Sequence, residues 1–357
     1  MVNATPNNAR AQSPSEMSVI RFLNALEPDY LPEQLPGREA ETKEIALALA
    51  PALAGRAPQP LFIQGKTGVG KTCSVRFVCR ELESSSKAKT VFINCWQSYT
   101  RQSVLSELAR SVGEALPRRG LAADEVFQRI TQACRKQKIV PVVVLDEVDQ
   151  LLVRGEDGVL YDLVRAHELH GVPIGVVCIT NDANAFMAMD DRVRTSFIAG
   201  KQEFKAYSPR ELREIVRDRV KKAFQPNAVD EEVIGLCTAR AAMEGGDARV
   251  AIHLLLAAGR RAEAGNADKV EARHVPVDAG NASQEKKFSR LNETEERILG
   301  LVAAGKSSGE LYAAVKKAKL DLSDRSVRTY LDRLVKKGFL KFEEKNEKGR
   351  TRYYERS

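Results

Sequence analysis

The chain has 357 residues, enough for two or three domains with sizeable cores, and carries a formal net charge of +8. Hydrophobic residues make up 43% and charged residues 29%, the ordinary balance of a folded globular protein. No run approaches the roughly 18 consecutive apolar residues of a membrane-spanning helix, so we expect a cytoplasmic protein with no membrane partner.

The cysteines are scattered among apolar neighbours and form no C-x-x-C pair. They are Cys73, Cys79, Cys95, Cys134, Cys178 and Cys237. This pattern favours buried free thiols in a reducing compartment over a disulfide framework or a cysteine metal site.

Residues 65–72 fit the phosphate-binding motif G-x-x-x-x-G-K-[ST]. They are Gly65, Lys66, Thr67, Gly68, Val69, Gly70, Lys71 and Thr72. A short apolar strand is predicted before them over residues 60–64, and helical apolar spacing follows them. In a strand–loop–helix unit, backbone N–H groups and the helix dipole face phosphate oxygens. We therefore predict an ATP or ADP site in which Lys71 reaches the β- and γ-phosphates and Thr72 holds Mg²⁺.

Two acidic residues follow the next strongly apolar strand. Residues 139–145 are β-branched and almost free of polar side chains, which predicts a buried parallel strand. Asp146 and Glu147 come directly after it. We predict that Asp146 positions Mg²⁺ and that Glu147 orients and deprotonates the attacking water. The alternative is a strand that ends in surface carboxylates.

Further strands are predicted over residues 91–95 and 174–179. Asn181 follows the latter and is a candidate to touch the γ-phosphate or the lytic water; an Asn-Asp turn that caps the next helix is the alternative. The alternation of strands and helices predicts an α/β fold with a doubly wound, mostly parallel sheet.

The order of P-loop, Asp-Glu pair, strand-terminal Asn and helical segment resembles that of AAA+ ATPases. Four stretches are more specific: residues 30–39 look like the box that closes over adenine, 145–151 like the Walker B of replication initiators, 117–127 like their initiator-specific region, and 246–255 like their sensor 2 helix. Together they resemble the archaeal origin-recognition and cell-division-control-six family, over about residues 29–352.

That resemblance implies roles for further residues near the nucleotide. Tyr30, Leu31, Leu35, Arg38 and Tyr207 would join the nucleotide-binding set.

Three arginine positions are also implied. Arg249 would contact the γ-phosphate from the helical lid, or be an exposed helix arginine. Arg192 would reach a neighbouring subunit's nucleotide, although Asp191 stands where the family often has Pro, and a solvated arginine is an equal alternative. Arg118 and Arg119 would touch the DNA backbone, or be plain loop arginines.

A small basic domain is predicted after a composition shift near residues 278–283. Helices are predicted over residues 293–304, 309–319 and 325–337, followed by strands over residues 339–343 and 351–355. Three helices and a hairpin make a winged helix. From Glu285 onward there are 19 Lys and Arg against 12 Asp and Glu, or +7 of the whole chain's +8. On charge alone, a polyanion partner, usually nucleic acid, and a solvated Lys-rich face are equal alternatives.

The third of these helices is predicted to enter the major groove of duplex DNA, while the hairpin contacts phosphate or the minor groove. The residues in question are Arg325, Ser326, Arg328, Thr329 and Arg333 on the helix, and Lys348, Arg350 and Arg352 on the hairpin. For each of these arginines, the alternative is an ordinary solvent-exposed residue with no DNA contact. Winged helices also bind proteins.

We predict four segments: a disordered tail at residues 1–16, an AAA+ base at 17–203, a helical lid at 204–283 and a winged helix at 284–357. The resemblance implies a nucleoid-associated, ATP-dependent replication initiator with slow, switch-like hydrolysis. Its partners would be origin duplex DNA, the minichromosome maintenance helicase and other initiator subunits. The alternatives are a P-loop ATPase regulator at promoters or mobile elements, and a non-enzymatic scaffold with a structural nucleotide.

Overall fold

A computed structural model describes residues 18–116, 120–276, 293–302, 306–318, 324–336, 339–346 and 350–356. The chain divides into two compact units, Met1–Pro276 and Val277–Ser357. The predicted tail at residues 1–16 and the predicted linker near residues 278–283 lie outside the described residues. In the part of the chain that is described, no helix has the length and apolar character needed to span a membrane.

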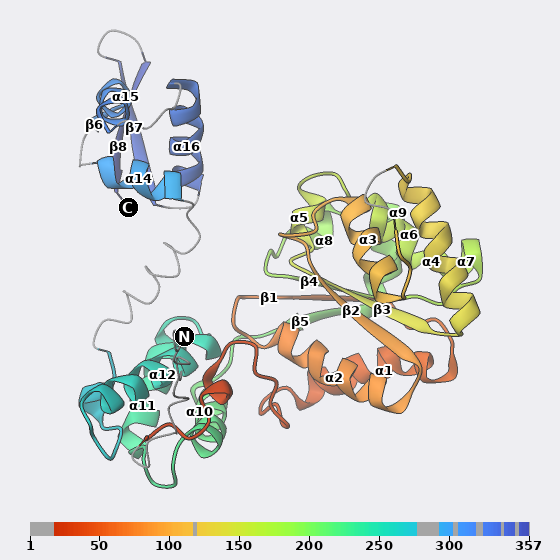
Figure 1. The fold of residues 1–357 in the computed structure, drawn as a ribbon, viewed down its shortest axis with the longest axis horizontal. Helices are drawn as coiled ribbons and strands as arrows, with labels where there is room; N and C mark the ends of the chain where they lie inside the picture. Colours follow the sequence, from red (N-terminus) through yellow and green to blue (C-terminus); the bar gives the residue numbers. More distant parts are fainter. Residues whose placement is uncertain are drawn as a thin grey trace, which may run out of the picture. The chain divides into compact units, whose positions relative to one another are not determined.

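A five-stranded parallel sheet forms the centre of the larger unit (Figure 1). Its spatial order is β2 (Ala88–Asn94), β3 (Val140–Asp146), β4 (Gly175–Thr180), β1 (Leu61–Gly65) and β5 (Lys201–Phe204). The predicted α/β fold is confirmed, and β1, β3 and β4 lie within one residue of their predicted bounds. The strand β5 was not predicted; it is a short edge strand whose exposed positions alternate with buried ones.

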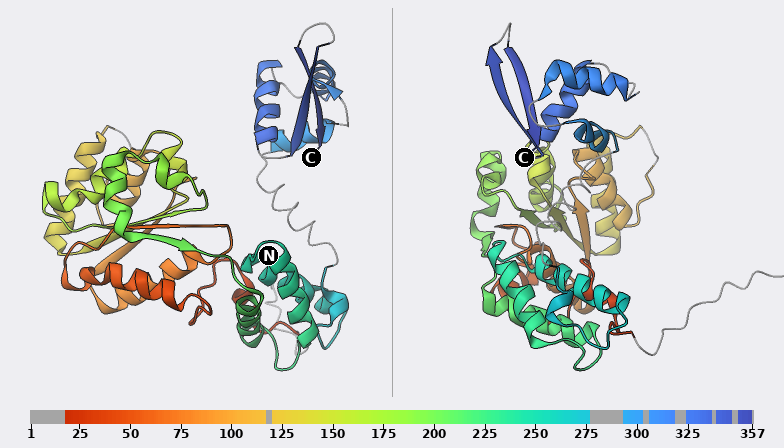
Figure 2. Two further views of the ribbon diagram at one scale, coloured as in Figure 1. Left: turned by 180° about the vertical axis from the view of Figure 1, so that it is seen from behind. Right: turned by 90° about the vertical axis from the view of Figure 1, so that its left-hand side faces the viewer.

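Helices cover both faces of this sheet, and Figure 2 shows the two layers from other directions. One face carries α1 (Glu39–Leu49) and α2 (Lys71–Ser85); the other carries α3 (Arg101–Ser111), α4 (Ala123–Gln137) and α6 (Gly158–Val164). Shorter helices are η2 (Ala50–Ala54), α5 (Asp149–Leu152), α7 (Ala166–His170), α8 (Ala185–Ala188), α9 (Asp191–Phe197) and η3 (Ile198–Gly200).

Each face of the sheet has its own hydrophobic core, and neighbouring residues of β1 pack into both of them. Phe62 packs into the cluster under α3 and α4, and Ile63 packs into the cluster under α1 and α2. Both are fully buried, and each such side chain contributes about 1.5–3 kcal/mol. The sheet is therefore held rigidly between its two layers, and its carboxyl edge is a fixed platform.

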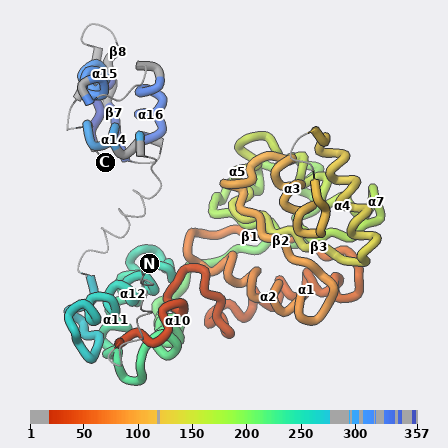
Figure 3. Tube along the Cα trace, viewed as in Figure 1, coloured from red at the N-terminus to blue at the C-terminus, as the bar shows by residue number. Residues whose placement is uncertain are grey.

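A helical bundle follows β5 in the same unit. It contains α10 (Pro209–Ala223), α11 (Glu231–Met243), α12 (Ala248–Ala264) and η4 (Ala272–His274). A capping box between Ser208 and Glu211, with Pro209 at the first helical position, starts α10. The helical lid was expected from residue 204, but Phe204 still pairs with Gly65 in β5, so the helices begin later. The N-terminal η1 (Leu23–Leu26) packs on α10 and α12 (Figure 3).

The smaller unit has three helices and a three-stranded antiparallel sheet. The helices are α14 (Glu293–Leu301), α15 (Ser308–Lys317) and α16 (Asp324–Lys336), and the sheet order is β6 (Lys306–Ser307), β8 (Arg350–Arg356) and β7 (Leu340–Asn346). Its core contains Ile298, Leu299, Val302, Leu311, Val315, Val327, Leu331, Leu334, Phe339, Leu340 and Tyr354. The predicted winged helix is confirmed. The two-residue β6 was missed because it is too short to show a periodic pattern.

Candidate functional site

The P-loop joins the end of β1 to the start of α2, and Gly70 caps that helix with a φ of +88°. Lys71 is only 8% exposed, and its ammonium donates hydrogen bonds to the carbonyls of Gly65 (2.7 Å) and Lys66 (2.8 Å). Burial lowers the pKa of Lys71 to about 8, against the opposing effect of the Asp146 carboxylate. The side chains of Lys66 and Thr67 are exposed at the tip of the loop. The Lys71 ammonium therefore lies inside the loop on carbonyls of the loop itself, and its contact with the β- and γ-phosphates stays a prediction.

The P-loop and the acidic strand end meet although β4 lies between their strands. The Thr72 hydroxyl donates to the Asp146 carboxylate at 2.8 Å. A hydroxyl and a carboxylate fit Mg²⁺, which prefers hard oxygen ligands and keeps several waters or phosphate oxygens. The described residues contain no group of three or more His, Cys, Asp or Glu side chains that could hold a metal ion alone. Waters or phosphate oxygens would supply the remaining ligands of a Mg²⁺ ion at this position.

Glu147 leaves the sheet in an unusual backbone conformation, with a φ of +57°. Such positions are uncommon for non-glycine residues and concentrate at functional sites. Nearby, the Thr180 hydroxyl donates to Asp149 at 2.8 Å and ties the end of β4 to α5. Asn181 follows Thr180 and is exposed. The role of Asp149 in holding this edge together was missed, because it depends on a contact 31 residues away.

The lid touches the P-loop directly through the start of α12. Asp247 caps this helix by accepting from the Arg249 backbone N–H at 2.8 Å, and the Ala248 N–H donates to the Gly68 carbonyl at 3.2 Å. The Asp247 carboxylate lies against Gly68, where an added Cβ would come within 1.7 Å of it. The half-exposed Arg249 guanidinium lies 3.6 Å from Asp247. Its charge also acts on Lys71. Sequence reasoning missed Asp247; its place before a helix start was the available signal.

We expect Gly68→Ala to weaken ATP binding by at least about tenfold, or about 1.4 kcal/mol. Gly68 has a φ of +78°, and the new methyl group would displace Asp247 from the P-loop. Gly113→Ala is the matched control, because Gly113 has a φ of +84° but nothing within 4 Å of the added Cβ. The control should lose only about 1–2 kcal/mol of stability. Calorimetric ATP titrations and thermal melts check both; equal ATP affinity of the Gly68 variant and the wild type would contradict the contact's importance.

Arg38 joins the predicted adenine box to the P-loop and to the segment that enters the lid. It is 3% exposed and donates to the carbonyls of Val69 (2.9 Å) and Lys205 (2.6 Å). Its guanidinium lies 3.8 Å from the Tyr207 ring centroid. The Tyr207 hydroxyl in turn lies against Gly70 of the P-loop. These donors already serve protein carbonyls, so the observed role of Arg38 is structural, and a direct nucleotide contact stays a prediction.

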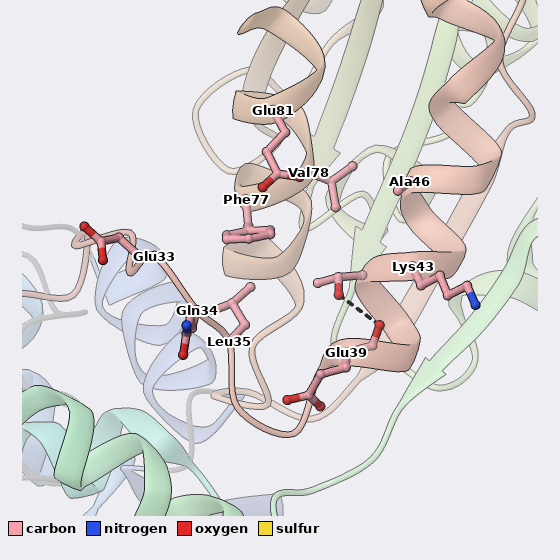
Figure 4. A pocket seen from close by; sticks show the side chains of 10 residues that line it. Glu33, Gln34, Leu35, Glu39, Lys43, Ala46, Phe77, Val78 and Glu81 are labelled. Carbon is pink, nitrogen blue, oxygen red and sulfur yellow. Dashed lines mark hydrogen bonds between the residues drawn. The ribbon is translucent and has the colours of Figure 1, made fainter. Parts of the chain in front are cut away.

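The rest of the adenine box lies in two places. The guanidinium of Arg219, on α10, lies 4.6 Å from the Tyr30 ring centroid, while Leu31 is half-buried. Leu35 lines a pocket of about 500 Å³ between α1 and α2 (Figure 4). Its other lining residues are Glu33, Gln34, Glu39, Thr42, Lys43, Ala46, Phe77, Val78 and Glu81. None of them belongs to the P-loop, so this pocket is separate from the phosphate site.

The arginine predicted to act on a neighbouring subunit is exposed on α9. Arg192 makes two 3.0 Å hydrogen bonds to the carboxylate of Asp190, and these bonds lower the pKa of Asp190 to about 2. Its side chain is 76% exposed. Arg118 and Arg119 lie outside the described residues.

The predicted DNA-contacting residues of the smaller unit divide between α16 and β8. On α16, Arg328, Thr329 and Arg333 are exposed, and Ser326 is half-buried; Arg325 lies in the same helix. Arg350 is the first residue of β8, whereas Lys348 lies outside the described residues. Arg352 pairs with Asp332 at 3.0 Å, and its guanidinium lies 4.6 Å from the Phe342 ring centroid.

A P-loop and an Asp-Glu pair at the edge of a five-stranded parallel sheet, with a helical lid on the loop, define an AAA+ ATPase fold. Two family models match the chain: an AAA domain over residues 55–184 and a Cdc6 AAA+ ATPase-type lid domain over residues 213–279. The ORC1-type DNA replication protein 1 of Aeropyrum pernix is 36% identical over 268 residues, which is 73% of this chain and 68% of that protein. This chain belongs to the family of ORC1-type DNA replication proteins.

A further relative and two solved structures also match this chain. The Sulfurisphaera tokodaii ORC1-type DNA replication protein 1 is 36% identical over 264 residues, covering 73% of this chain but only 66% of that protein's length. Among solved structures, Aeropyrum pernix ORC1 in complex with DNA matches with a TM-score of 0.83 and 32% identity, over 96% of this chain and 94% of that chain. Drosophila ORC bound to DNA has a TM-score of 0.61 at 18% identity, over 98% of this chain and 93% of that chain, and shares the fold.

Proposed function

We propose that this chain is an ATP-dependent DNA replication initiator, which binds origin duplex DNA and helps to recruit the minichromosome maintenance helicase. The observation that carries the proposal is the meeting of Lys71, the Asp146–Glu147 pair and the Asp247–Arg249 cap at one sheet edge. The same chain carries a winged helix, and a DNA-bound ORC1 matches it. The proposed segments are a base at residues 17–203, whose last strand runs on through Phe204, a lid from there to residue 283 and a DNA-binding domain at 284–357.

At the nucleotide site, Lys71 would hold phosphate oxygens, while Thr72 and Asp146 would hold Mg²⁺. The bound metal supplies positive charge that neutralises those oxygens. Glu147 would orient the attacking water and accept its proton. Asn181 would contact the γ-phosphate from the base.

The position of the lid would depend on whether ATP or ADP is bound. Arg249 would contact the γ-phosphate from α12, and Arg192 would reach the nucleotide of another initiator subunit. Because α12 rests on the P-loop, ATP and ADP would favour different lid positions, and slow hydrolysis would reset them.

Duplex DNA would bind along α16 and the hairpin, with Arg118 and Arg119 as further phosphate contacts. Ser326, Thr329 and Arg333 recur at i, i+3 and i+7, which places them on one helix face for the major groove. Such binding would place the protein at the nucleoid.

The double substitution of Arg328 and Arg333 by Ala is expected to weaken duplex binding by about tenfold or more. It should also reduce the slope of log affinity against log salt by about two, because two of the cations that displace counterions from the duplex are lost. Arg297→Ala, an exposed charge on α14, is the matched control and should change binding little. Fluorescence anisotropy at several salt concentrations measures both. An unchanged slope would remove α16 from the DNA interface.

Genome-wide occupancy of the tagged protein, mapped alongside replication start sites, tests the initiator role. Enrichment at one or a few replication starts is expected. Enrichment at promoters or element ends instead would favour the regulator alternative and leave the ATPase and DNA-binding proposals standing.

A further inference from the structure

Asp332 lies on the exposed face of α16, the helix proposed to enter the major groove. The buried stripe of this helix contains Val327, Leu331 and Leu334. Because successive helical residues are about 100° apart, Asp332 lies about 200° round the helix from Leu334 and faces away from that stripe. Its neighbours on the exposed surface are Arg328 and Thr329, one turn earlier, and its side chain is 51% exposed. A carboxylate therefore stands among the residues proposed to contact DNA.

A guanidinium from the hairpin holds this carboxylate in place. Arg352 on β8 donates to Asp332 Oδ1 at 3.0 Å. The same guanidinium lies 4.6 Å from the Phe342 ring centroid, donates a hydrogen bond to the Tyr354 hydroxyl, and belongs to a side chain that is only 27% exposed. Arg352 is thus fixed on several sides, and it orients Asp332 in turn. Because this bond uses Oδ1, the other carboxylate oxygen can accept a further hydrogen bond.

The chemistry of a carboxylate limits what it can contact on duplex DNA. It accepts hydrogen bonds and repels phosphate. In the major groove, the only hydrogen-bond donors are the amino groups of cytosine and adenine. Adenine places its N7 acceptor beside its amino group, and this acceptor repels a carboxylate, whereas cytosine presents its amino group alone. Cytosine is therefore the base that fits Asp332.

We propose that Asp332 determines sequence specificity by accepting a hydrogen bond from the N4 amino group of a cytosine, and that Arg352 is the residue that positions it. The inference rests on the proposed function, because it takes duplex DNA as the ligand and α16 as the helix in the major groove. It replaces the phosphate or minor-groove contact expected for Arg352 from the sequence, since that guanidinium is already engaged within its own domain.

The alternative for the same ion pair is a brace that holds the hairpin against α16 without any base contact. An exposed ion pair contributes little to stability in water, so a brace alone gives a weak reason for a carboxylate on this face. The two roles predict different results when Asp332 is replaced. A brace changes the melting temperature only, whereas a base contact changes which base pair is preferred.

Selection of binding sites from a pool of randomised DNA duplexes by the full-length chain measures base preference directly. The wild type should select cytosine at one position of its site, and should bind duplexes with another base pair there about tenfold more weakly. Asp332→Ala should lose the preference at that position alone. Asp332→Asn should change the preferred base from cytosine to adenine, because an amide pairs with N6 and N7 of adenine.

Two further variants test the positioning role and the effect of charge. Arg352→Ala should weaken the preference for cytosine; a uniform loss of affinity over all sequences, with the preference intact, would overturn the positioning role. Glu355→Gln is the matched control, because it removes another exposed carboxylate from β8 and should leave base preference unchanged.

The outcomes separate this inference from the proposed function. Asp332 variants that bind duplex and still select cytosine at every position where the wild type does would overturn the inference and leave the proposed function standing. A wild-type chain that binds no duplex would fail the proposed function, and the inference with it. Thermal melting of each variant shows that it is folded.

Discussion

Replacement of Lys71 by Ala is expected to lower ATP affinity by about a hundredfold or more. The ammonium lies inside the P-loop, where it donates to the carbonyls of Gly65 and Lys66. With ATP bound, the ammonium would donate to the β- and γ-phosphates instead. Charge-assisted hydrogen bonds contribute about 1.5–3 kcal/mol each, so the loss of one or two bonds to phosphate corresponds to this factor. Burial already disfavours the charged form of Lys71, so the variant should remain folded.

Isothermal titration with ATP, together with thermal melting, measures the effect. Lys87→Ala removes an exposed ammonium beyond the end of α2 and should bind ATP as the wild type does. Undiminished ATP binding by the Lys71 variant would mean that the phosphates bind elsewhere.

The substitution Glu147→Gln should abolish turnover without loss of ATP binding. The amide has nearly the same size and keeps the backbone position at the end of β3, but it cannot accept a proton from water. Loss of a general base slows a reaction by about 100–10,000-fold. Phosphate release by the purified variant should fall by that factor, while its ATP affinity stays within about threefold of the wild type.

Asp149→Asn is the matched control two residues further along. Its carboxylate accepts from Thr180 and Gln150 and holds the edge of the sheet, so it has a structural role. We expect a smaller decrease in hydrolysis, below about tenfold, with a lower melting temperature. Equal rates for the Glu147 variant and the wild type would assign the base to another group.

The central strands of the larger unit were predictable because burial on both faces leaves a simple apolar signature. Residues 142–145 are fully buried in β3, and a short continuous run of β-branched and apolar residues is typical of a central parallel strand. The edge strand β5 carries Lys201 and Glu203 at exposed positions, so its pattern resembles a polar loop. Its existence depends on pairing with β1, which the local sequence does not encode.

The candidate functional site likewise contains one part that was predictable from the sequence and one part that was not. The P-loop and the Asp146–Glu147 pair were predictable because phosphate and metal chemistry restricts both residue types and spacing. The contact of Asp247 with Gly68 was not, because it joins residues 179 positions apart. The exposure of Trp96 also escaped prediction: an aromatic residue after a strand is usually buried, and only the packed structure shows that it is not.

The buried guanidinium of Arg38 has a mechanical consequence. One of its nitrogens holds the carbonyl of Val69 in the P-loop, and another holds the carbonyl of Lys205 at the entrance to the lid. The guanidinium therefore couples the P-loop directly to the segment that enters the lid. A small displacement of the Val69 carbonyl would be passed to the start of α10, whose 15 residues would act as a lever arm of about 20 Å. Sub-ångström changes around phosphate would thus become changes in the tilt of a whole helical bundle.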